Sequence, residues 1–98
     1  MECQFSHSDF SQATLFEVAV SEGNFTGANF RSANLSNQRG STGFWQQSNF
    51  TGADFTNANL SGVQDRGGDV FTGAIWANTI CPDGTNSDAH GHTCIGHF

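Results

Sequence analysis

Large apolar residues recur at every fifth position along most of this chain. The row is interrupted only at Gly40 and Asp65 and comprises Phe5, Phe10, Leu15, Val20, Phe25, Phe30, Leu35, Trp45, Phe50, Phe55, Leu60, Val70, Ile75 and Ile80. A period of five matches neither the 3.6 residues per turn of an amphipathic helix nor the two-residue alternation of a strand. The pattern therefore indicates an array of short repeats, and we predict that this row forms the stacked core.

A second row of small residues, such as Ala13, Ala28 and Ala53, lies two places before the large ones. Asn or Asp usually separates the two rows, and Ser or Thr often follows the large residue. The unit is clearest at residues 27–30, 32–35, 52–55 and 57–60. This pattern resembles that of the pentapeptide-repeat proteins over roughly residues 3–80. The resemblance implies an all-β fold, a right-handed quadrilateral β-helix in which four pentapeptides form the four sides of one coil.

If four repeats make one coil, residues twenty apart lie on the same face. The expected columns are Phe5, Phe25, Trp45 and Asp65; Phe10, Phe30, Phe50 and Val70; Leu15, Leu35, Phe55 and Ile75; and Val20, Gly40, Leu60 and Ile80. Three of these four columns are apolar wherever they are not Gly. We therefore predict about four stacked coils, with Phe30 between Phe10 and Phe50.

Two segments, residues 36–43 and 64–69, lack the regular repeat. Because the row of large residues continues in frame beyond both, we expect any excursion there to add whole five-residue units. The segments contain Arg39 and Arg66, two of the chain's three cationic residues. They are either surface irregularities or loops that contact a partner, as loops on repeat proteins often do.

The formal net charge is −6, and the chain contains no Lys. Nucleic-acid binding rests largely on Lys and Arg side chains that neutralise phosphates, so we expect no nucleic-acid partner. Some long pentapeptide-repeat proteins are thought to imitate duplex DNA and bind DNA gyrase, and the resemblance implies such a regulator as an alternative function. Because this array is short and its acids are sparse, an acidic surface that favours solubility is the simpler interpretation.

No residues in the repeat region form a catalytic motif. His7 is the only His before residue 90, and Tyr and Lys are absent, so the usual general acids and bases are scarce. We expect a protein that is not an enzyme and needs no cofactor. The chain also lacks an apolar run long enough to cross a bilayer as a helix, so no membrane span is expected.

The tail, residues 81–98, differs in composition from the repeats of residues 1–80, and we expect it to cap the same domain. It opens with Cys-Pro-Asp-Gly-Thr-Asn-Ser and contains a second cysteine, Cys94, and it resembles the C-terminal segment of known pentapeptide-repeat proteins. The resemblance implies a disulfide between Cys81 and Cys94 that closes a loop over the last coil. A disulfide indicates an extracytoplasmic or secreted protein. Cys3, in the row of small residues, would then remain a buried thiol.

The tail leaves two metal-binding alternatives open. Its oxygen-bearing side chains Asp83, Asn86 and Asp88 could bind calcium, although the order of acids found in an EF-hand is missing. Its histidines His90, His92 and His97 could bind zinc together with the two cysteines. A disulfide would remove both thiolates from such a zinc site.

These features predict a structural or protein-interaction scaffold. Nothing before Phe5 is long enough to cover the first coil, whereas the tail is long enough to cover the last one. An uncovered coil exposes unpaired strand edges. We therefore expect self-association through the N-terminal coil, or a natural chain that continues upstream. The sequence identifies neither a partner nor a pathway.

Overall fold

The computed structural model describes residues 3–15, 20–36, 45–63 and 67–95. Its regular elements are short: β1 (Cys3–Gln4), β2 (Val20–Ser21), β3 (Gly23–Asn24), β4 (Trp45–Gln46) and the 3₁₀-helix η1 (Ser87–His90). Strand β1 pairs in parallel with β3, and β2 pairs in parallel with β4. Further parallel bridges join successive turns of the chain, which winds as the expected right-handed quadrilateral β-helix. Within the described residues, no helix is long and apolar enough to span a membrane.

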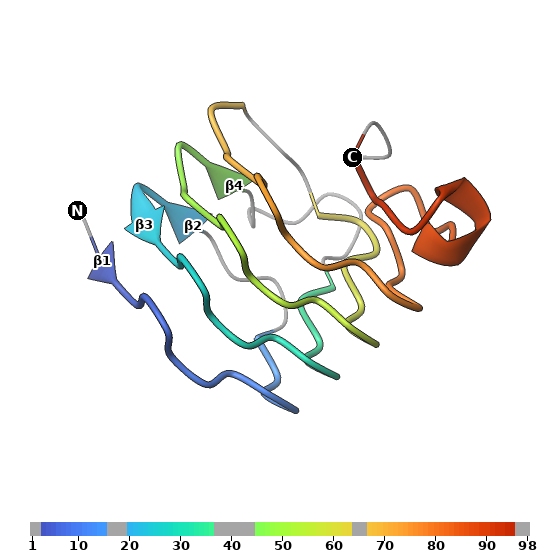
Figure 1. Ribbon diagram of the computed structural model, residues 1–98, viewed down its shortest axis with the longest axis horizontal. Coiled ribbons are helices and arrows are strands. Elements are labelled where there is room, and N and C mark those ends of the chain that lie inside the picture. The colour runs from blue at the N-terminus through green and yellow to red at the C-terminus, as the bar shows by residue number, and fades with distance from the viewer. Residues whose placement is uncertain (1–2, 16–19, 37–44, 64–66, 96–98) are drawn as a thin grey trace.

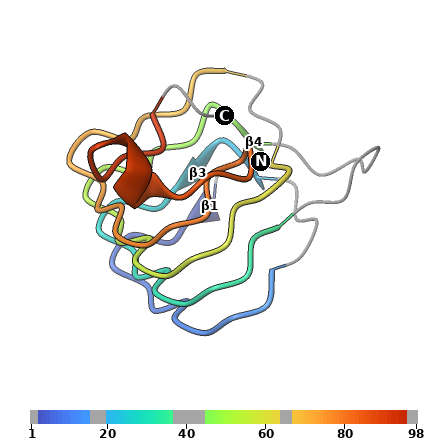
Figure 2. The ribbon, with the colours of Figure 1, turned by 90° about the vertical axis from the view of Figure 1, so that its right-hand side faces the viewer.

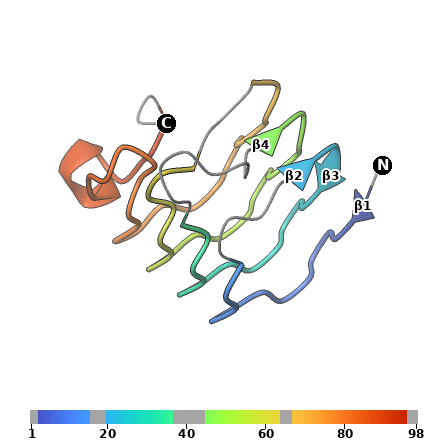
Figure 3. The ribbon, with the colours of Figure 1, turned by 180° about the vertical axis from the view of Figure 1, so that it is seen from behind.

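The coils stack along one direction, with β1 at one end of the stack and η1 at the other (Figures 1 and 3). Viewed from the C-terminal end, the segment that carries η1 lies across part of the last coil (Figure 2). A segment outside the repeats therefore covers part of the C-terminal end of the stack, and no such segment is described at the N-terminal end.

Most described corners of the coil are tight turns. At these corners the N–H of a small residue donates to the carbonyl of the large residue three places earlier, as from Ala28 to Phe25 (3.0 Å) and from Ala53 to Phe50 (3.0 Å). The residue before the small one has a positive φ, for example 69° at Gly52. Type II turns require a positive φ at this third position, where Gly and Asn are favoured. This requirement explains why Gly or a polar residue recurs there.

The recurring Asn and Asp residues hold the same corners from outside. The Asn24 side-chain oxygen accepts hydrogen bonds from the Thr26 N–H (3.1 Å) and the Thr26 hydroxyl (2.7 Å). The Asp54 carboxylate does the same for Thr56 (2.9 and 2.6 Å). Such bonds from a side chain to the backbone two residues on stabilise a turn. They account for the Ser or Thr that often follows the large residue.

Two ladders of stacked aromatic rings form most of the core. One ladder runs through Phe5, Phe25, Phe50 and Phe71, with ring centroids 5.2, 5.0 and 5.3 Å apart. The other runs through Phe10, Phe30, Phe55 and Trp76, with centroids 5.1, 5.1 and 4.7 Å apart. These spacings are close to the separation of hydrogen-bonded strands, so ring stacking and backbone pairing reinforce each other.

The step from coil to coil is not always four repeats long. Asn29 pairs with Asp9 four repeats earlier, but the step from Asn29 to its next partner, Asp54, is one whole repeat longer. The predicted columns are therefore right only between the first two coils. Phe30 stacks between Phe10 and Phe55, and its ring is tilted by 57° to that of Phe50. The prediction that Phe50 stacks on Phe30 was wrong.

The last coil also corrects the predicted core. Val70 and Ile75 are 42% and 49% exposed, and Ile80 is half-buried. The residues that point inward are each one place later: Phe71, Trp76 and Cys81.

The physical reason is the length of the last step. Asp54 pairs with Ile75, which lies four repeats and one extra residue further along the chain. Ile75 therefore takes the place that Asn29 and Asp54 hold in earlier coils, and its neighbour Trp76 takes the inward place. The second excursion does not add whole five-residue units, contrary to the sequence prediction.

The rest of the predicted row is placed as follows. The large residues from Phe25 to Leu60 that the structure describes are buried, namely Phe25, Phe30, Leu35, Trp45, Phe50, Phe55 and Leu60. Phe10 and Leu15 are half-buried and Phe5 is 37% exposed. The side chains of Cys3 and Val20, and all of Arg39, Gly40, Asp65 and Arg66, lie outside the described residues.

Candidate functional site

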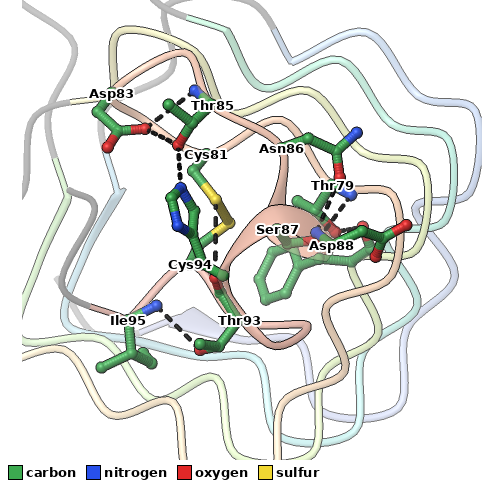
Figure 4. The surroundings of a disulfide bond; sticks show 12 residues. Thr79, Cys81, Asp83, Thr85, Asn86, Ser87, Asp88, Thr93, Cys94 and Ile95 are labelled. Atoms are coloured by element: carbon green, nitrogen blue, oxygen red, sulfur yellow. Dashed lines mark hydrogen bonds between the residues drawn. A yellow bond between two sulfur atoms is a disulfide. The ribbon is translucent and has the colours of Figure 1, made fainter.

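The C-terminal end of the β-helix is closed by a disulfide-bonded segment. Cys81 and Cys94 form the disulfide that the resemblance of the tail implied, with their Cα atoms 5.2 Å apart (Figure 4). Both residues are fully buried. Because the two sulfurs are bonded to each other, neither cysteine can serve as the thiolate ligand that the zinc alternative requires.

Hydrogen bonds join this segment to the last coil. The Ser87 N–H donates to the Thr79 carbonyl (2.8 Å), and the Thr79 N–H donates to the Ser87 hydroxyl oxygen (3.0 Å). The Thr79 hydroxyl in turn donates to the Phe55 carbonyl (2.7 Å) in the coil before. Thr79 and Ser87 are both fully buried. The segment thus pairs with the Thr79 carbonyl, which is equivalent to the Ala58 carbonyl that accepts from Ile80 of the next coil.

The short helix η1 positions Ser87 for this contact. Asn86 is its N-cap, and its side-chain oxygen accepts a hydrogen bond from the Asp88 N–H (2.9 Å). Gly91 ends the helix in the left-handed conformation with φ 72°, and its N–H donates to the Ser87 carbonyl. Asn at an N-cap and Gly after the last turn are the residues that helix ends favour.

Asp88 fastens the segment to an outer corner of the last coil. Its carboxylate accepts a hydrogen bond from the Asn78 N–H (3.0 Å) and lies 2.9 Å from Nδ1 of His92. The pKa of Asp88 is lowered first by the Asn78 backbone hydrogen bond and then by the bond to His92. Asp88 therefore attaches the segment to the last coil in its ionised form.

Two of the metal candidates in the tail, Asp83 and His90, both bond to Thr85. Asp83 accepts hydrogen bonds from the N–H and the hydroxyl of Thr85 (Figure 4), and Nε2 of His90 lies 2.8 Å from the same hydroxyl oxygen. The hydroxyl has one hydrogen and donates it to Asp83, so His90 donates to Thr85 and cannot act as its base. No three metal-binding side chains cluster within the described residues, which exclude His97.

The N-terminal end has no comparable cover among the described residues. Phe5 is 37% exposed, whereas Phe25, directly below it in the stack, is 9% exposed. The N–H groups of Asn29 and Asn34 in the second coil donate to Ser8 and Ala13 of the first. The equivalent N–H groups of the first coil, those of Asp9 and Thr14, have no backbone partner among the described residues. This end offers an unpaired edge and the exposed ring of Phe5.

Few charges surround the open edge. Within residues 3–15, His7 and Asp9 are the only His, Asp, Glu, Lys or Arg side chains. The pKa of Asp9 is lowered by hydrogen bonds from the Ser11 side chain and from the Ser11 N–H (2.9 Å). An apolar face rimmed by unpaired backbone groups can pair with another polypeptide.

The sequence prediction missed Phe71 and Trp76 as core residues, although a signal for them exists. The tetrapeptide Phe-Thr-Gly-Ala begins at Phe25, Phe50 and Phe71. The first interval is five whole repeats and the second is four repeats and one residue, which are the same steps that the backbone pairing shows. Matching this longer motif, rather than assuming a constant period, would have placed both rings correctly.

Comparisons with known proteins agree with this architecture. The sequence profile described as Pentapeptide repeats matches eight copies over residues 3–37 and 44–64, which is more than half of the chain. Among solved structures, the chain is similar to a pentapeptide repeat protein from the thylakoid lumen of Arabidopsis thaliana. The two share 23% identity and a TM-score of 0.55, over 94% of this chain and 75% of that one.

A second similar structure is HetL, a pentapeptide repeat protein involved in heterocyst differentiation regulation from the cyanobacterium Nostoc sp. strain PCC 7120. It shares 22% identity, with a TM-score of 0.31, over 87% of this chain and 42% of HetL. At these identities, the likeness to the Arabidopsis protein speaks for the fold alone. No curated protein sequence matches the chain.

Proposed function

The chain belongs to the pentapeptide-repeat family, and we propose that it is a non-catalytic scaffold that binds a protein partner through its open N-terminal coil. The family is typically non-catalytic. Within the described residues, the contact nearest to a catalytic arrangement is that of Asp83, Thr85 and His90, in which the hydroxyl hydrogen points to the carboxylate. That arrangement supports a structural role for the tail.

The observation that carries the proposal is the unpaired edge of the first coil. The N–H groups of Asp9 and Thr14 and the exposed ring of Phe5 all belong to the first coil. Unpaired strand edges bind polypeptide by adding a strand, with backbone hydrogen bonds giving affinity and side chains giving specificity. At the C-terminal end the capping segment occupies one side of the corresponding edge, where Ser87 and Thr85 pair with Thr79 and Cys81.

We further propose that the protein works in an oxidising, extracytoplasmic compartment. The support is the fully buried Cys81–Cys94 disulfide, since structural disulfides persist in such compartments and are rare in the cytosol. Rapid alkylation of thiols in the native host would test this point. We expect Cys81 and Cys94 to escape alkylation unless a reductant is added first, and their immediate labelling would overturn the proposal.

The binding surface can be tested by photo-cross-linking. A benzoylphenylalanine residue would replace Phe5 in one variant and Val70 in another, which is a matched control because Val70 is 42% exposed on the outer side of the last coil. We expect a discrete cross-linked species from position 5 and none from position 70. Equal cross-linking at both positions, or none at position 5, would contradict a binding role for the open coil.

A further inference from the structure

We propose that the open N-terminal coil binds a second copy of this chain, head to head, about a two-fold axis perpendicular to the stack. This inference rests on the proposed function, because both require the edge of the first coil to be a binding surface. It adds the identity of the partner and the geometry of the contact.

The capping segment blocks the alternative head-to-tail contact. It lies across part of the last coil (Figure 2), so a whole coil of another copy cannot stack there. On the side that the segment covers, the Cys81 N–H donates to the Thr85 carbonyl and the Thr79 carbonyl accepts from the Ser87 N–H. Among the described residues, the first coil is therefore the end on which another coil can stack. Two such ends form a closed two-fold dimer, whereas a head-to-tail contact would extend into a filament.

The handedness of the coil makes the paired edges run antiparallel. In a right-handed coil that leads away from the contact plane, the chain turns clockwise as seen from that plane. The same holds for the second copy viewed from its own side, so the two chains run in opposite directions across the contact. Antiparallel pairing lets the unpaired N–H groups of Asp9 and Thr14 reach carbonyls of the partner's first coil.

The aromatic ladders select one position for the axis. An axis through the corner between Phe5 and Phe10 places each of these rings over the other ring of the partner. Both ladders then continue across the contact, as they continue from Phe5 to Phe25 and from Phe10 to Phe30 within the chain. An axis through the next corner would instead place Phe10 over Leu15 of the partner subunit and lose this stacking.

The size and charge of the end fit a reversible dimer. One coil leads from Cys3 to its pairing partner Gly23, which is at the small end of the roughly 20–30 residues a side in standard protein interfaces. Within residues 3–15 of this coil Asp9 is the only carboxylate, whereas Glu17 and Glu22 follow before Gly23. The low charge therefore holds for the part of the contact that carries Phe5 and Phe10. We expect a dimer whose population rises with concentration.

Analytical ultracentrifugation tests the partner. We expect the sedimentation coefficient to rise with concentration for the unmodified chain. Phe5→Lys, which puts a charge on each side of the contact, should weaken the dimer at least tenfold, whereas Val70→Lys should leave it unchanged. A chain that stays monomeric, or a dimer equally weakened by both variants, would overturn the inference.

Cysteine cross-linking tests the axis without disturbing the core. Ser6→Cys and Ser11→Cys alter two exposed residues at successive corners of the first coil, each in a Cys3→Ala background so that the introduced thiol is the only one outside the disulfide. The proposed axis brings the two copies of residue 6 together and keeps residue 11 apart. Oxidation should therefore link Ser6→Cys into a dimer and not Ser11→Cys, and the reverse result would overturn the geometry.

The two proposals fail differently. If the chain is monomeric but benzoylphenylalanine at position 5 cross-links a different protein, the second-copy partner is wrong and the binding role of the open coil stands. If the chain is monomeric and position 5 cross-links nothing, both are wrong.

Discussion

The first and last coils of this β-helix are built from the same repeat, yet they meet very different surroundings. In the first coil, the Phe5 ring is 37% exposed, whereas Trp76 in the last coil is 4% exposed. The difference does not come from the repeats, because both rings stack on a buried Phe of the neighbouring coil. It comes from the segment after residue 80, which has no counterpart at the other end among the described residues.

The comparison shows what a repeat array cannot supply for itself. Each coil pairs its backbone and stacks its rings only against its neighbours, so the outermost coils always have one unsatisfied side. Closing the C-terminal side takes a non-repetitive segment with an N-cap at Asn86, a left-handed Gly91, a buried hydroxyl at Ser87 and a disulfide. We therefore expect a partner to bind the first coil, which no such segment covers among the described residues.

The largest expected effect compares two rings of the same ladder. Phe50 is 1% exposed and stacks between Phe25 and Phe71, so Phe50→Ala should lower the free energy of unfolding by about 3–5 kcal/mol. Phe5→Ala should cost only about 1–2 kcal/mol, because the ring is already 37% exposed and has a coil on one side only. Urea unfolding at a dilution that keeps the chain monomeric would measure both. Equal costs would show that the first coil is as well packed as the interior of the stack.

The next effect concerns the closed end alone. Cys81→Ala combined with Cys94→Ala removes a cross-link between residues 13 apart. The loss should be about 3 kcal/mol by the chain-entropy account of a loop of this size. Hydrogen exchange should then quicken at the amides of Cys81 and Ser87, which pair the segment with the last coil.

The same experiment contains its own control at the open end. The amides of Phe5 and Phe10 donate to the second coil. Once the exchange rates are corrected for the lower global stability of the variant, the rates of these two amides should be unchanged. If they accelerated as much as the amides of the capping segment, the disulfide would stabilise the array as a whole and the two ends would not be independent.

Sequence reasoning reached the fold because the period of five is a direct consequence of four-sided coils. The period is uninterrupted from Phe5 to Leu35, and there the predicted column of Phe10 and Phe30 is correct. The column fails after Ser36, because a coil longer by one whole repeat keeps every large residue inward but moves it to the next side of the coil. The inward row fails after Val63, because a coil longer by a single residue changes the register itself.

The tail shows a different limit. Resemblance predicted the pair Cys81 and Cys94, which the structure contains, but it did not predict the bond between Ser87 and Thr79 or the attachment of Asp88 to Asn78. These contacts join residues 8 and 10 places apart through a turn whose conformation depends on the last coil beneath it. Single residues with ordinary polar side chains leave no periodic signal of such contacts.

Acid should loosen the closed end through Asp88. Its folded-state pKa lies below the reference value of 3.8, so its contribution to stability is present above that value and is lost as the pH falls through the folded-state pKa. The amide exchange of Asn78, which donates to Asp88, should therefore accelerate over this acid range. In Asp88→Asn the acid step at Asn78 should vanish.

Asp9 provides the matched group at the open end, because its pKa is also lowered, by Ser11. Asp9→Asn should abolish the acid response of the Ser11 amide and leave that of Asn78 intact. If Asp9→Asn changed the acid response at Asn78, the exchange at both sites would reflect acid unfolding of the whole chain. Asp88 would then not attach the segment locally.

The smallest expected effect tests the register on which the description of the closed end depends. Ile75 takes the place that Asn29 and Asp54 hold in earlier coils, where a side-chain oxygen accepts a hydrogen bond from the N–H two residues on. In Ile75→Asn, the introduced amide oxygen can accept the Ala77 N–H in the same way, while the replaced residue was already 49% exposed. The urea midpoint should thus shift by less than about 0.5 kcal/mol equivalent, as for an ordinary surface substitution. Were the constant twenty-residue period correct, residue 75 would point into the core, and the same change would cost at least about 2 kcal/mol by burying an amide in place of an aliphatic side chain.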